Sequence, residues 1–189
     1  MTIYTDGSAA PNPGQGGYGV VLLDDNDNII ECYQHREEYT TNNIQELKSI
    51  LYALIKYGVN INNLLLGFVQ PPIVYSDSAY AVNTFNSWMF SWERNGWLKS
   101  DNKVPENLEL IQAYFDLYQK GWRIDLRKVK GHNNIKGNEL ADKLATNKLT
   151  VEQIYKMAEI ERRWRMKYIY CFTNLINGKK YIGSTIQKP

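Results

Sequence analysis

The chain has 189 residues, of which 43% are hydrophobic and 22% charged, and its formal net charge is +2. This composition is typical of one folded domain with an appendage and excludes a wholly disordered chain. No apolar run approaches the roughly 20 residues that span a bilayer, and MTIYTDGS lacks the features of an export signal, so we expect a cytoplasmic protein with no membrane partner.

The first sixty residues predict three antiparallel strands and a helix. The stretch YTDGS (4–8) ends an apolar, β-branched segment at an Asp-Gly pair, and AAPNPGQGG (9–17) is typical of a turn. YGVVLLDD (18–25) and NIIECYQH (28–35) predict two further strands joined by polar residues. A helix to about Tyr57 follows, capped by Thr41, Asn42 or Asn43 and ended by Gly58.

Strands and helices alternate in the next part of the chain. The predicted elements are a short buried strand at IVYSDS (73–78), a helix at AYAVNTFNSW (79–88), a tryptophan-rich segment at 88–103, a helix through Tyr118, a last strand at 121–132 and a last helix at 136–149. This order favours an α/β fold in which helices cover a mixed sheet.

The C-terminal part is basic. Residues 1–150 carry 14 Lys and Arg against 17 Asp and Glu (net −3), whereas residues 151–189 carry 8 against 3 (net +5). Such an excess fits a nucleic-acid partner or an ordinary solvated surface equally well. Residues 151–167 predict a charged helical linker, and KYIYCFTNLINGKKYIGST predicts a hairpin that turns at Asn177-Gly178. Cys171, in this hairpin, and the distant Cys32 predict no disulfide framework.

Four acidic residues occupy unusual places in this pattern. Asp6 and Asp77 end predicted strands, Glu46 heads an otherwise apolar helix row, and Asp142 lies among apolar residues of the last helix. Each has an ordinary explanation. These are a turn for Asp6, an N-cap for Asp77, a surface site near a helix start for Glu46, and an exposed i, i+4 pair with Asn138 for Asp142.

Taken together, the four carboxylates predict a metal site. If the strands of Asp6 and Asp77 are neighbours, all four converge at one place, where like charges raise each other's pKa. Divalent cations relieve this repulsion, and oxygen ligands suit Mg²⁺ or Mn²⁺. Two such ions about 3.5–4 Å apart are suited to phosphodiester hydrolysis.

These residues lie in blocks that resemble type 1 ribonuclease H, the endonuclease that cuts the RNA strand of RNA–DNA hybrids. The blocks are TDGSAAPNPGQGGYG (5–19), NNIQEL (42–47), YSDSAYAV (75–82), SWMFSWERNGW (87–97), VKGHNN (129–134) and GNELADKLA (137–145). The resemblance covers about residues 1–148. It implies a ribonuclease H-like α/β fold with a mixed five-stranded sheet, three antiparallel strands followed by two parallel ones, flanked by helices.

The resemblance also implies roles for individual residues. Asp6, Glu46, Asp77 and Asp142 would bind two Mg²⁺ ions, with Asp6 bridging both, Glu46 and Asp77 on the leaving-group side and Asp142 on the nucleophile side. His132 would be the family's mobile histidine, which assists proton transfer or product release. The RNA 2′-hydroxyl groups would be read by the Gly7 backbone, Asn12, Asn43 and Gln45.

The segment 87–97 corresponds to the family's basic protrusion, which grips the DNA strand. Its expected substrate contacts are Trp88, Trp92, Arg94 and Trp97, although packing of the helical region explains each tryptophan ring equally well. The segment carries few cations, so we expect weaker hybrid binding than in more basic relatives unless the +5 tail compensates.

The tail carries a second resemblance, to the opening hairpin of GIY-YIG nucleases, through Tyr170, Tyr181 and Gly183. That family's arginine and metal-binding glutamate are expected beyond Pro189, so the hairpin is not expected to cut by itself. It is either part of a truncated fusion or an element that packs or binds.

The sequence therefore predicts three parts: a catalytic domain at 1–148, a linker at 149–166 and a GIY-YIG-like hairpin at 167–189. The predicted enzyme is a monomer that hydrolyses the RNA strand of RNA–DNA hybrids with Mg²⁺, or with Mn²⁺, and leaves 5′-phosphate and 3′-hydroxyl ends. Two alternatives remain open. One is a catalytically weak module of the same fold that binds hybrid, and the other is a polynucleotidyl transferase that also joins strands.

Overall fold

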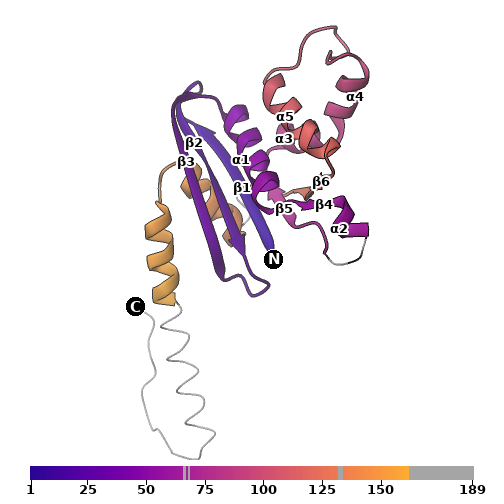
Figure 1. Cartoon of the computed structure of the whole chain (residues 1–189). Helices are drawn as coiled ribbons and strands as arrows, with labels where there is room; N and C mark the ends of the chain where they lie inside the picture. The colour runs from indigo at the N-terminus through magenta and orange to yellow at the C-terminus, as the bar shows by residue number, and fades with distance from the viewer. Residues whose placement is uncertain (66, 68, 132–133, 162–189) are drawn as a thin grey trace, which may run out of the picture. The chain divides into compact units, whose positions relative to one another are not determined.

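A mixed five-stranded sheet forms the centre of the computed structural model, which describes residues 1–65, 67, 69–131 and 134–161 (Figure 1). Its strands are β1 (Thr2–Ala9), β2 (Gly14–Leu23), β3 (Ile29–Thr40), β5 (Ile73–Ser76) and β7 (Asp125–Lys128), in the order β3-β2-β1-β5-β7. The first three strands are antiparallel, while β5 runs parallel to both β1 and β7. The predicted sheet is therefore confirmed.

Helices cover both faces of this sheet (Figure 1). They are α1 (Asn42–Tyr57), α2 (Ile61–Leu65), α3 (Ala79–Asn83), the π-helical segment η1 (Thr84–Trp88), α4 (Met89–Arg94), α5 (Leu108–Gln119) and α6 (Lys136–Ala145). One apolar cluster joins the sheet to α1, α3, η1, α4 and α5, and a second joins it to α6. In β2, Val20 and Leu22 belong to the first cluster and Val21 and Leu23 to the second, because alternate side chains of a strand point to opposite faces.

The structure departs from the predicted elements in three places. The segment 121–132 forms two strands, β6 (Trp122–Arg123) and β7, and β6 pairs with β4 (Val59–Asn60) in a small ribbon that no local pattern predicts. Strand β2 begins at Gly14, so the predicted turn at 9–17 is shorter. Helix α6, predicted to reach residue 149, ends at Ala145, because Asn147 takes a left-handed conformation (φ 59°).

The chain divides into two compact units, Met1–Ile154 and Tyr155–Pro189. Residues 151–161 are helical, and Ile154 packs into the apolar cluster beneath α6. None of the helices among the described residues has the length and apolar character needed to cross a bilayer. The predicted GIY-YIG-like hairpin lies outside the described residues.

The N-terminal cap of α1 gives a first testable prediction. Thr41 is the cap, and its hydroxyl accepts a hydrogen bond from the Ile44 N–H at 3.3 Å. Removal of a capping side chain leaves that N–H without its partner, so we expect Thr41→Ala to lower the free energy of unfolding by about 1 kcal/mol. Urea denaturation measures this loss. Thr41→Ser should keep most of the stability, and equal losses in the two variants would contradict the assigned cap.

Candidate active site

Asp6 and Asp77 are brought together by the parallel pairing of β1 and β5. This pairing ends at Thr5 opposite Ser76, and each of these residues is followed by its aspartate. Asp6 does not end its strand as predicted, because β1 continues to Ala9 through its pairing with β2. What ends at Asp6 is the β1–β5 ladder, and Asp77 leaves β5 at the same level.

Glu46 joins them because α1 lies directly on β1. A Cβ atom on Gly7 would lie 2.2 Å from the Glu46 backbone nitrogen and 2.3 Å from the Gln45 carbonyl carbon. Only a residue without a side chain permits this approach. Since Glu46 lies in the first turns of α1, the absence of a side chain at Gly7 places its carboxylate beside Asp6.

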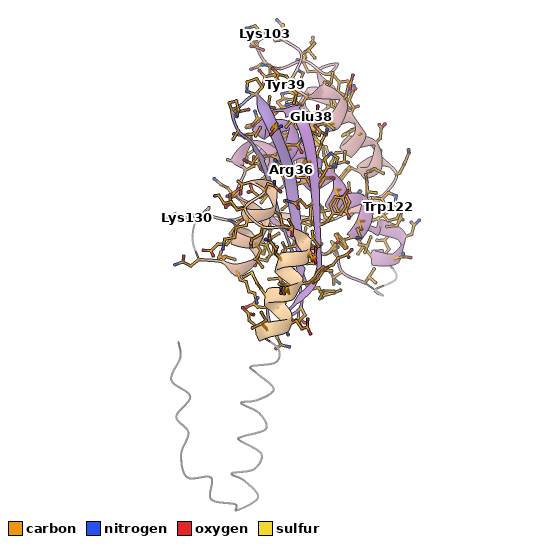
Figure 2. The ribbon with its side chains drawn as sticks, turned by 90° about the vertical axis from the view of Figure 1, so that its left-hand side faces the viewer. Arg36, Glu38, Tyr39, Lys103, Trp122 and Lys130 are labelled. Carbon is orange, nitrogen blue, oxygen red and sulfur yellow. The ribbon has the colours of Figure 1, made fainter. Side chains whose placement is uncertain are left out.

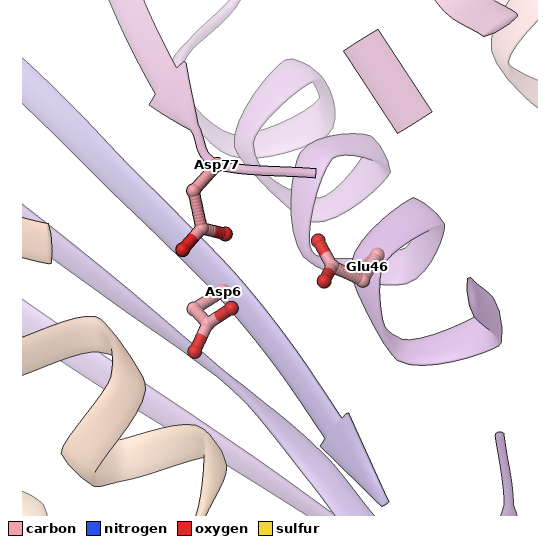
Figure 3. Close-up of side chains that lie close together, drawn as sticks. All are labelled: Asp6, Glu46 and Asp77. Atoms are coloured by element: carbon pink, nitrogen blue, oxygen red, sulfur yellow. The ribbon is translucent and has the colours of Figure 1, made fainter. Parts of the chain in front are cut away.

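The three carboxylates form a compact cluster. One carboxylate oxygen from each of Asp6, Glu46 and Asp77 lies within 4.8 Å of the others (Figure 3). The Asp6 side chain is buried, and Glu46 Oε2 is a buried atom with no hydrogen-bond partner among the described residues. A buried acceptor without a donor is costly, so the cluster is built for a positively charged ligand.

The electrostatics of the cluster follow from burial and from like charge. Burial, followed by the charges of Asp77 and Asp142, raises the pKa of Asp6 to about 7. Burial, followed by the charges of Asp6 and Asp77, raises the pKa of Glu46 well above its ordinary value. The cluster therefore holds protons near neutral pH unless another cation replaces them.

Asp77 is free to act in this cluster because Ser78 caps the next helix. The Ser78 hydroxyl accepts a hydrogen bond from the Ala81 N–H at 3.2 Å. The ordinary explanation of Asp77 as an N-cap is therefore wrong. A Cβ atom on Gly131 would lie 2.9 Å from Asp77 Oδ2, so a glycine keeps the loop after β7 close to this carboxylate.

Asp142 reaches the same cavity from α6, on the other side of β1. The cavity has a volume of about 210 Å³. It is lined by Asp6, Gly7, Ser8, Asn42, Glu46, Asp77, Asn138, Glu139 and Asp142. The Asp142 carboxylate is not one of the three that lie within 4.8 Å, and its Oδ2 lies 3.8 Å from Lys148 Nζ. Asn138 is 4% exposed and its Oδ1 has no partner among the described residues, so the two do not form an exposed polar pair.

Comparison with known proteins decides the family. The ribonuclease H family model matches residues 1–150. The ribonuclease H of Caldanaerobacter subterraneus subsp. tengcongensis is 38% identical over 152 residues, covering 79% of this chain and 90% of that protein. The chain belongs to the ribonuclease H family. A second ribonuclease H, from Mycolicibacterium smegmatis, is 36% identical over 154 residues, covering 79% of this chain and 87% of that protein.

Solved structures share the fold of this ribonuclease H. The solution structure of the PFV RNase H domain has a TM-score of 0.61 at 22% identity and covers 77% of this chain and 92% of that one. LC11-RNase H1, solved in complex with an RNA/DNA hybrid, has a TM-score of 0.53 at 22% identity and covers 82% of this chain and 98% of that one.

Some of the residues expected to read the 2′-hydroxyl groups lie at the cavity of this ribonuclease H, and others lie away from it. Gly7 lines the cavity, and Asn12 lies beside it, because its Oδ1 accepts a hydrogen bond from the Asn42 N–H at 3.2 Å. Asn42 itself lines the cavity and accepts a hydrogen bond from the Ala9 N–H at 2.6 Å through its Oδ1. We expected Asn43, which is half-buried and does not line the cavity, and missed Asn42, although both were candidate helix caps.

The expected role of Gln45 in substrate contact is wrong. Its side chain is completely buried, and its Nε2 donates to Glu37 Oε2 at 2.9 Å and to Thr40 Oγ1 at 2.8 Å. Both partners lie on β3, so the side chain points into the layer between α1 and the sheet. Position 45 is the residue before Glu46, where the helix turns a side chain away from the cavity.

The tryptophan segment forms a separate cavity of about 610 Å³, whose lining includes Trp88, Trp92, Asn95 and Lys99. Trp88 is 39% exposed, and Arg94 is exposed at the end of α4. Trp97 packs edge-on against Phe115 with ring centroids 5.3 Å apart, so its ring serves the helical core. His132 lies outside the described residues, and its role stays a prediction.

The raised pKa of Asp6 gives a second prediction, on stability. Some carboxyl groups have a higher pKa in the folded protein than in the unfolded chain. Such a group stabilises the fold at any pH below its unfolded-state pKa, and this stabilisation is lost as the pH rises through its folded-state pKa. For Asp6 this window extends from about pH 4 to about pH 7. We expect the metal-free protein to lose about 2–4 kcal/mol across it, at about 1.4 kcal/mol per pKa unit. Urea denaturation in EDTA at pH 5 and pH 8 measures the larger part of this loss, and saturating Mg²⁺ should reduce it. An equal loss in Asp6→Asn would contradict the assignment.

Proposed function

We propose that this ribonuclease H hydrolyses the RNA strand of RNA–DNA hybrids as an endonuclease that depends on two divalent cations. The observation that carries the proposal is the cluster of Asp6, Glu46 and Asp77, three carboxylates from β1, α1 and the end of β5 whose oxygens approach within 4.8 Å. Family membership supports the same conclusion independently.

The donor set fits Mg²⁺ or Mn²⁺. Its ligand atoms are carboxylate oxygens, which hard divalent cations prefer, and no cysteine or histidine belongs to the cluster among the described residues. The buried, unpartnered Glu46 Oε2 and the raised pKa of Asp6 both indicate that positive charge is needed there. Two bound cations would supply activation of the attacking water and stabilisation of the leaving oxygen.

Each carboxylate has a distinct proposed place. Asp6 lies on β1, which pairs with the strand that carries Asp77 and packs against the helix that carries Asp142. It would therefore contact both cations. Glu46 and Asp77 would hold the cation on the 3′-leaving-group side, and Asp142, which lines the cavity from α6, would hold the one on the nucleophile side. The expected products are 5′-phosphate and 3′-hydroxyl ends.

Recognition of the RNA strand is proposed to come from the polar rim of this cavity. Gly7 and Asn42 line the cavity with the carboxylates, and Asn12 is hydrogen-bonded to the Asn42 N–H, so these residues could read the 2′-hydroxyl groups that distinguish RNA from DNA. A contact from Asn43 stays a prediction. Trp88 and Trp92, which line their own cavity, and the exposed Arg94 at the end of α4 would contact the second strand. A monomeric state and a cytoplasmic location stay predictions.

An end-group analysis tests the proposed reaction. A uniformly labelled RNA–DNA hybrid is incubated with the protein and Mg²⁺ or Mn²⁺, and the fragments are treated with phosphatase or extended by a polymerase. We expect internal cuts whose fragments carry removable 5′-phosphates and extendable 3′-hydroxyls. Fragments with 3′-phosphates would contradict the two-cation mechanism, and intact hybrid that the protein nevertheless binds would favour a binding module.

A further inference from the structure

Two side chains of β3, at the edge of the sheet opposite to β7, reach the C-terminal end of α6. The Gln34 Nε2 donates to the Leu144 carbonyl at 2.7 Å, and the Arg36 Nη1 donates to the Ala145 carbonyl at 2.6 Å. Both carbonyls belong to the last turn of α6, where the helix supplies no N–H partners. A guanidinium there also faces the negative end of the helix dipole. Figure 2 labels Arg36 on this strand.

Two glycines of β2 allow these contacts. Gly17 and Gly19 pair with Arg36 and Gln34 in the β2–β3 ladder. A Cβ atom on Gly17 would lie 2.0 Å from the His35 carbonyl oxygen and 3.0 Å from Arg36 Cδ, and one on Gly19 would lie 2.4 Å from the Ala141 carbonyl oxygen. A side chain at Gly17 would push the β3 backbone and Arg36 away from β2, and one at Gly19 would lift α6 from the sheet. The glycine-rich stretch 14–19 therefore does more than make a turn.

The chain after α6 is held by the same group of contacts. Left-handed Asn147 turns the chain back, so that the Lys148 N–H donates to the Lys143 carbonyl at 2.8 Å. Gln34 Nε2 also lies 3.3 Å from both Asn147 Oδ1 and the Leu149 carbonyl oxygen. One β3 side chain thus joins the end of the helix to the returning chain.

Asp142 lies within the last turn of α6, whose carbonyl groups Gln34 and Arg36 hold. Its carboxylate is outside the group of three that lie within 4.8 Å of one another. Because Asp142 is carried by α6, its distance from those three carboxylates depends on where α6 is placed. We propose that Arg36 and Gln34 are positioning residues for Asp142, which fix the C-terminal end of α6 and thereby the nucleophile side of the cation site. This proposal rests on the proposed function of the four carboxylates.

The chain contains a matched control for the arginine. Arg123 Nη1 donates to the Tyr118 carbonyl at 2.6 Å, at the C-terminal end of α5. This is the same kind of bond at the same length, but α5 contributes no residue to the carboxylate cavity. Arg123 also donates to the Trp122 carbonyl at 2.9 Å and lies over the Tyr118 ring. Arg123→Met therefore removes this bond together with other local contacts, so a change in Mg²⁺ dependence seen in Arg36→Met alone reports an effect on Asp142.

The first readout is the Mg²⁺ dependence of hybrid cleavage. We expect Arg36→Met to raise the half-saturating Mg²⁺ concentration about 10-fold, the lower range for loss of a residue that orients a metal ligand. The kcat at saturating Mg²⁺ should change little, and Arg36→Lys should restore much of the affinity. Arg123→Met should keep the wild-type Mg²⁺ dependence. If Arg36→Met and Arg123→Met show the same Mg²⁺ dependence, the positioning role is wrong.

The second readout needs no cleavage. Addition of Mg²⁺ to the hybrid-free protein should shift the backbone amide NMR signals of Asn138 and Asp142, and the titration should require more Mg²⁺ in Arg36→Met than in Arg123→Met. Gln34→Met, which loses a neutral bond, provides a milder variant if Arg36→Met does not fold, and it should shift both readouts in the same direction. Identical titrations in Gln34→Met and wild type would overturn the proposal, whereas absent hybrid cleavage by the wild type would count against the proposed function alone.

Discussion

Replacement of Asp6 by Asn is expected to abolish hybrid cleavage while making the metal-free protein more stable. Asp6 is the carboxylate that faces both Asp77 and Asp142, and burial, followed by their charges, raises its pKa to about 7. The neutral amide removes this repulsion but also removes the central anionic ligand. We expect a loss of kcat of at least about 100-fold, as for removal of a principal electrostatic group from an active site.

The gain in stability distinguishes this result from ordinary damage. At pH 8 in EDTA, Asp6→Asn should raise the free energy of unfolding by about 2 kcal/mol, part of the repulsion that its shifted pKa represents. Asp116→Asn, an exposed carboxylate on α5, is the matched control and should change neither quantity. A variant that loses both activity and stability would indicate that Asp6 is needed for folding and would contradict the electrostatic account.

Replacement of Gly7 by Ala is expected to affect folding and catalysis together. The added methyl group would lie 2.2 Å from the Glu46 nitrogen and 2.3 Å from the Gln45 carbonyl carbon, both of which are backbone atoms of α1 that no rotamer change can move. The helix must therefore shift away from β1. Such overpacking costs about 3 kcal/mol, and it carries Glu46 away from Asp6 and Asp77.

Urea denaturation and the Mg²⁺ dependence of cleavage measure the two effects. We expect the half-saturating Mg²⁺ concentration of Gly7→Ala to rise by at least about 10-fold, because displacement of a ligand by even 1 Å weakens the site strongly. Gly67→Ala is the control, since a Cβ atom there meets nothing within 4 Å and only its positive φ of 73° is strained. Wild-type Mg²⁺ dependence in Gly7→Ala would show that α1 does not depend on this glycine for its position.

Local sequence patterns predicted the parts of the fold that depend on local physics. The apolar periodicity of α1 and the continuous apolar run YGVVLL of β2 are local signals, and both elements form, although β2 begins at Gly14 rather than at Tyr18. The β4–β6 ribbon was not predictable in this way, because two residues on each side, Val59–Asn60 and Trp122–Arg123, carry no periodic pattern. Its pairing is decided by packing of segments more than sixty residues apart.

The candidate site was predictable to a similar degree. The carboxylates could be identified because each is a charge in an apolar setting, and their convergence follows from the pairing of β1 with β5. The choice between neighbouring residues was harder: Ser78 rather than Asp77 caps α3, and Asn42 rather than Asn43 lines the cavity. Which of two adjacent polar residues faces the cavity depends on the exact start of a helix, which a sequence pattern places only to within a residue or two.

The burial of Gln45 and the role of β3 show what sequence patterns leave out. A glutamine beside a predicted ligand looks like a substrate contact, yet its hydrogen bonds to Glu37 and Thr40 place it behind the site. Arg36 and Gln34 lie on a strand that contributes no residue to the cavity, and their contact with α6 spans more than one hundred residues. Such long-range contacts become visible only in the folded structure.

The most direct test of the central claim compares wild-type protein with Asp77→Asn on a labelled RNA–DNA hybrid in Mg²⁺, beside duplex RNA and duplex DNA of the same sequence. Ser78, and not Asp77, caps α3. The substitution therefore removes a carboxylate of the cluster without removing the capping hydrogen bond of this helix. The account predicts that wild-type protein cuts the RNA of the hybrid alone and that folded Asp77→Asn does not. Equal cleavage by the two proteins, or cleavage of duplex RNA as fast as the hybrid, would contradict it.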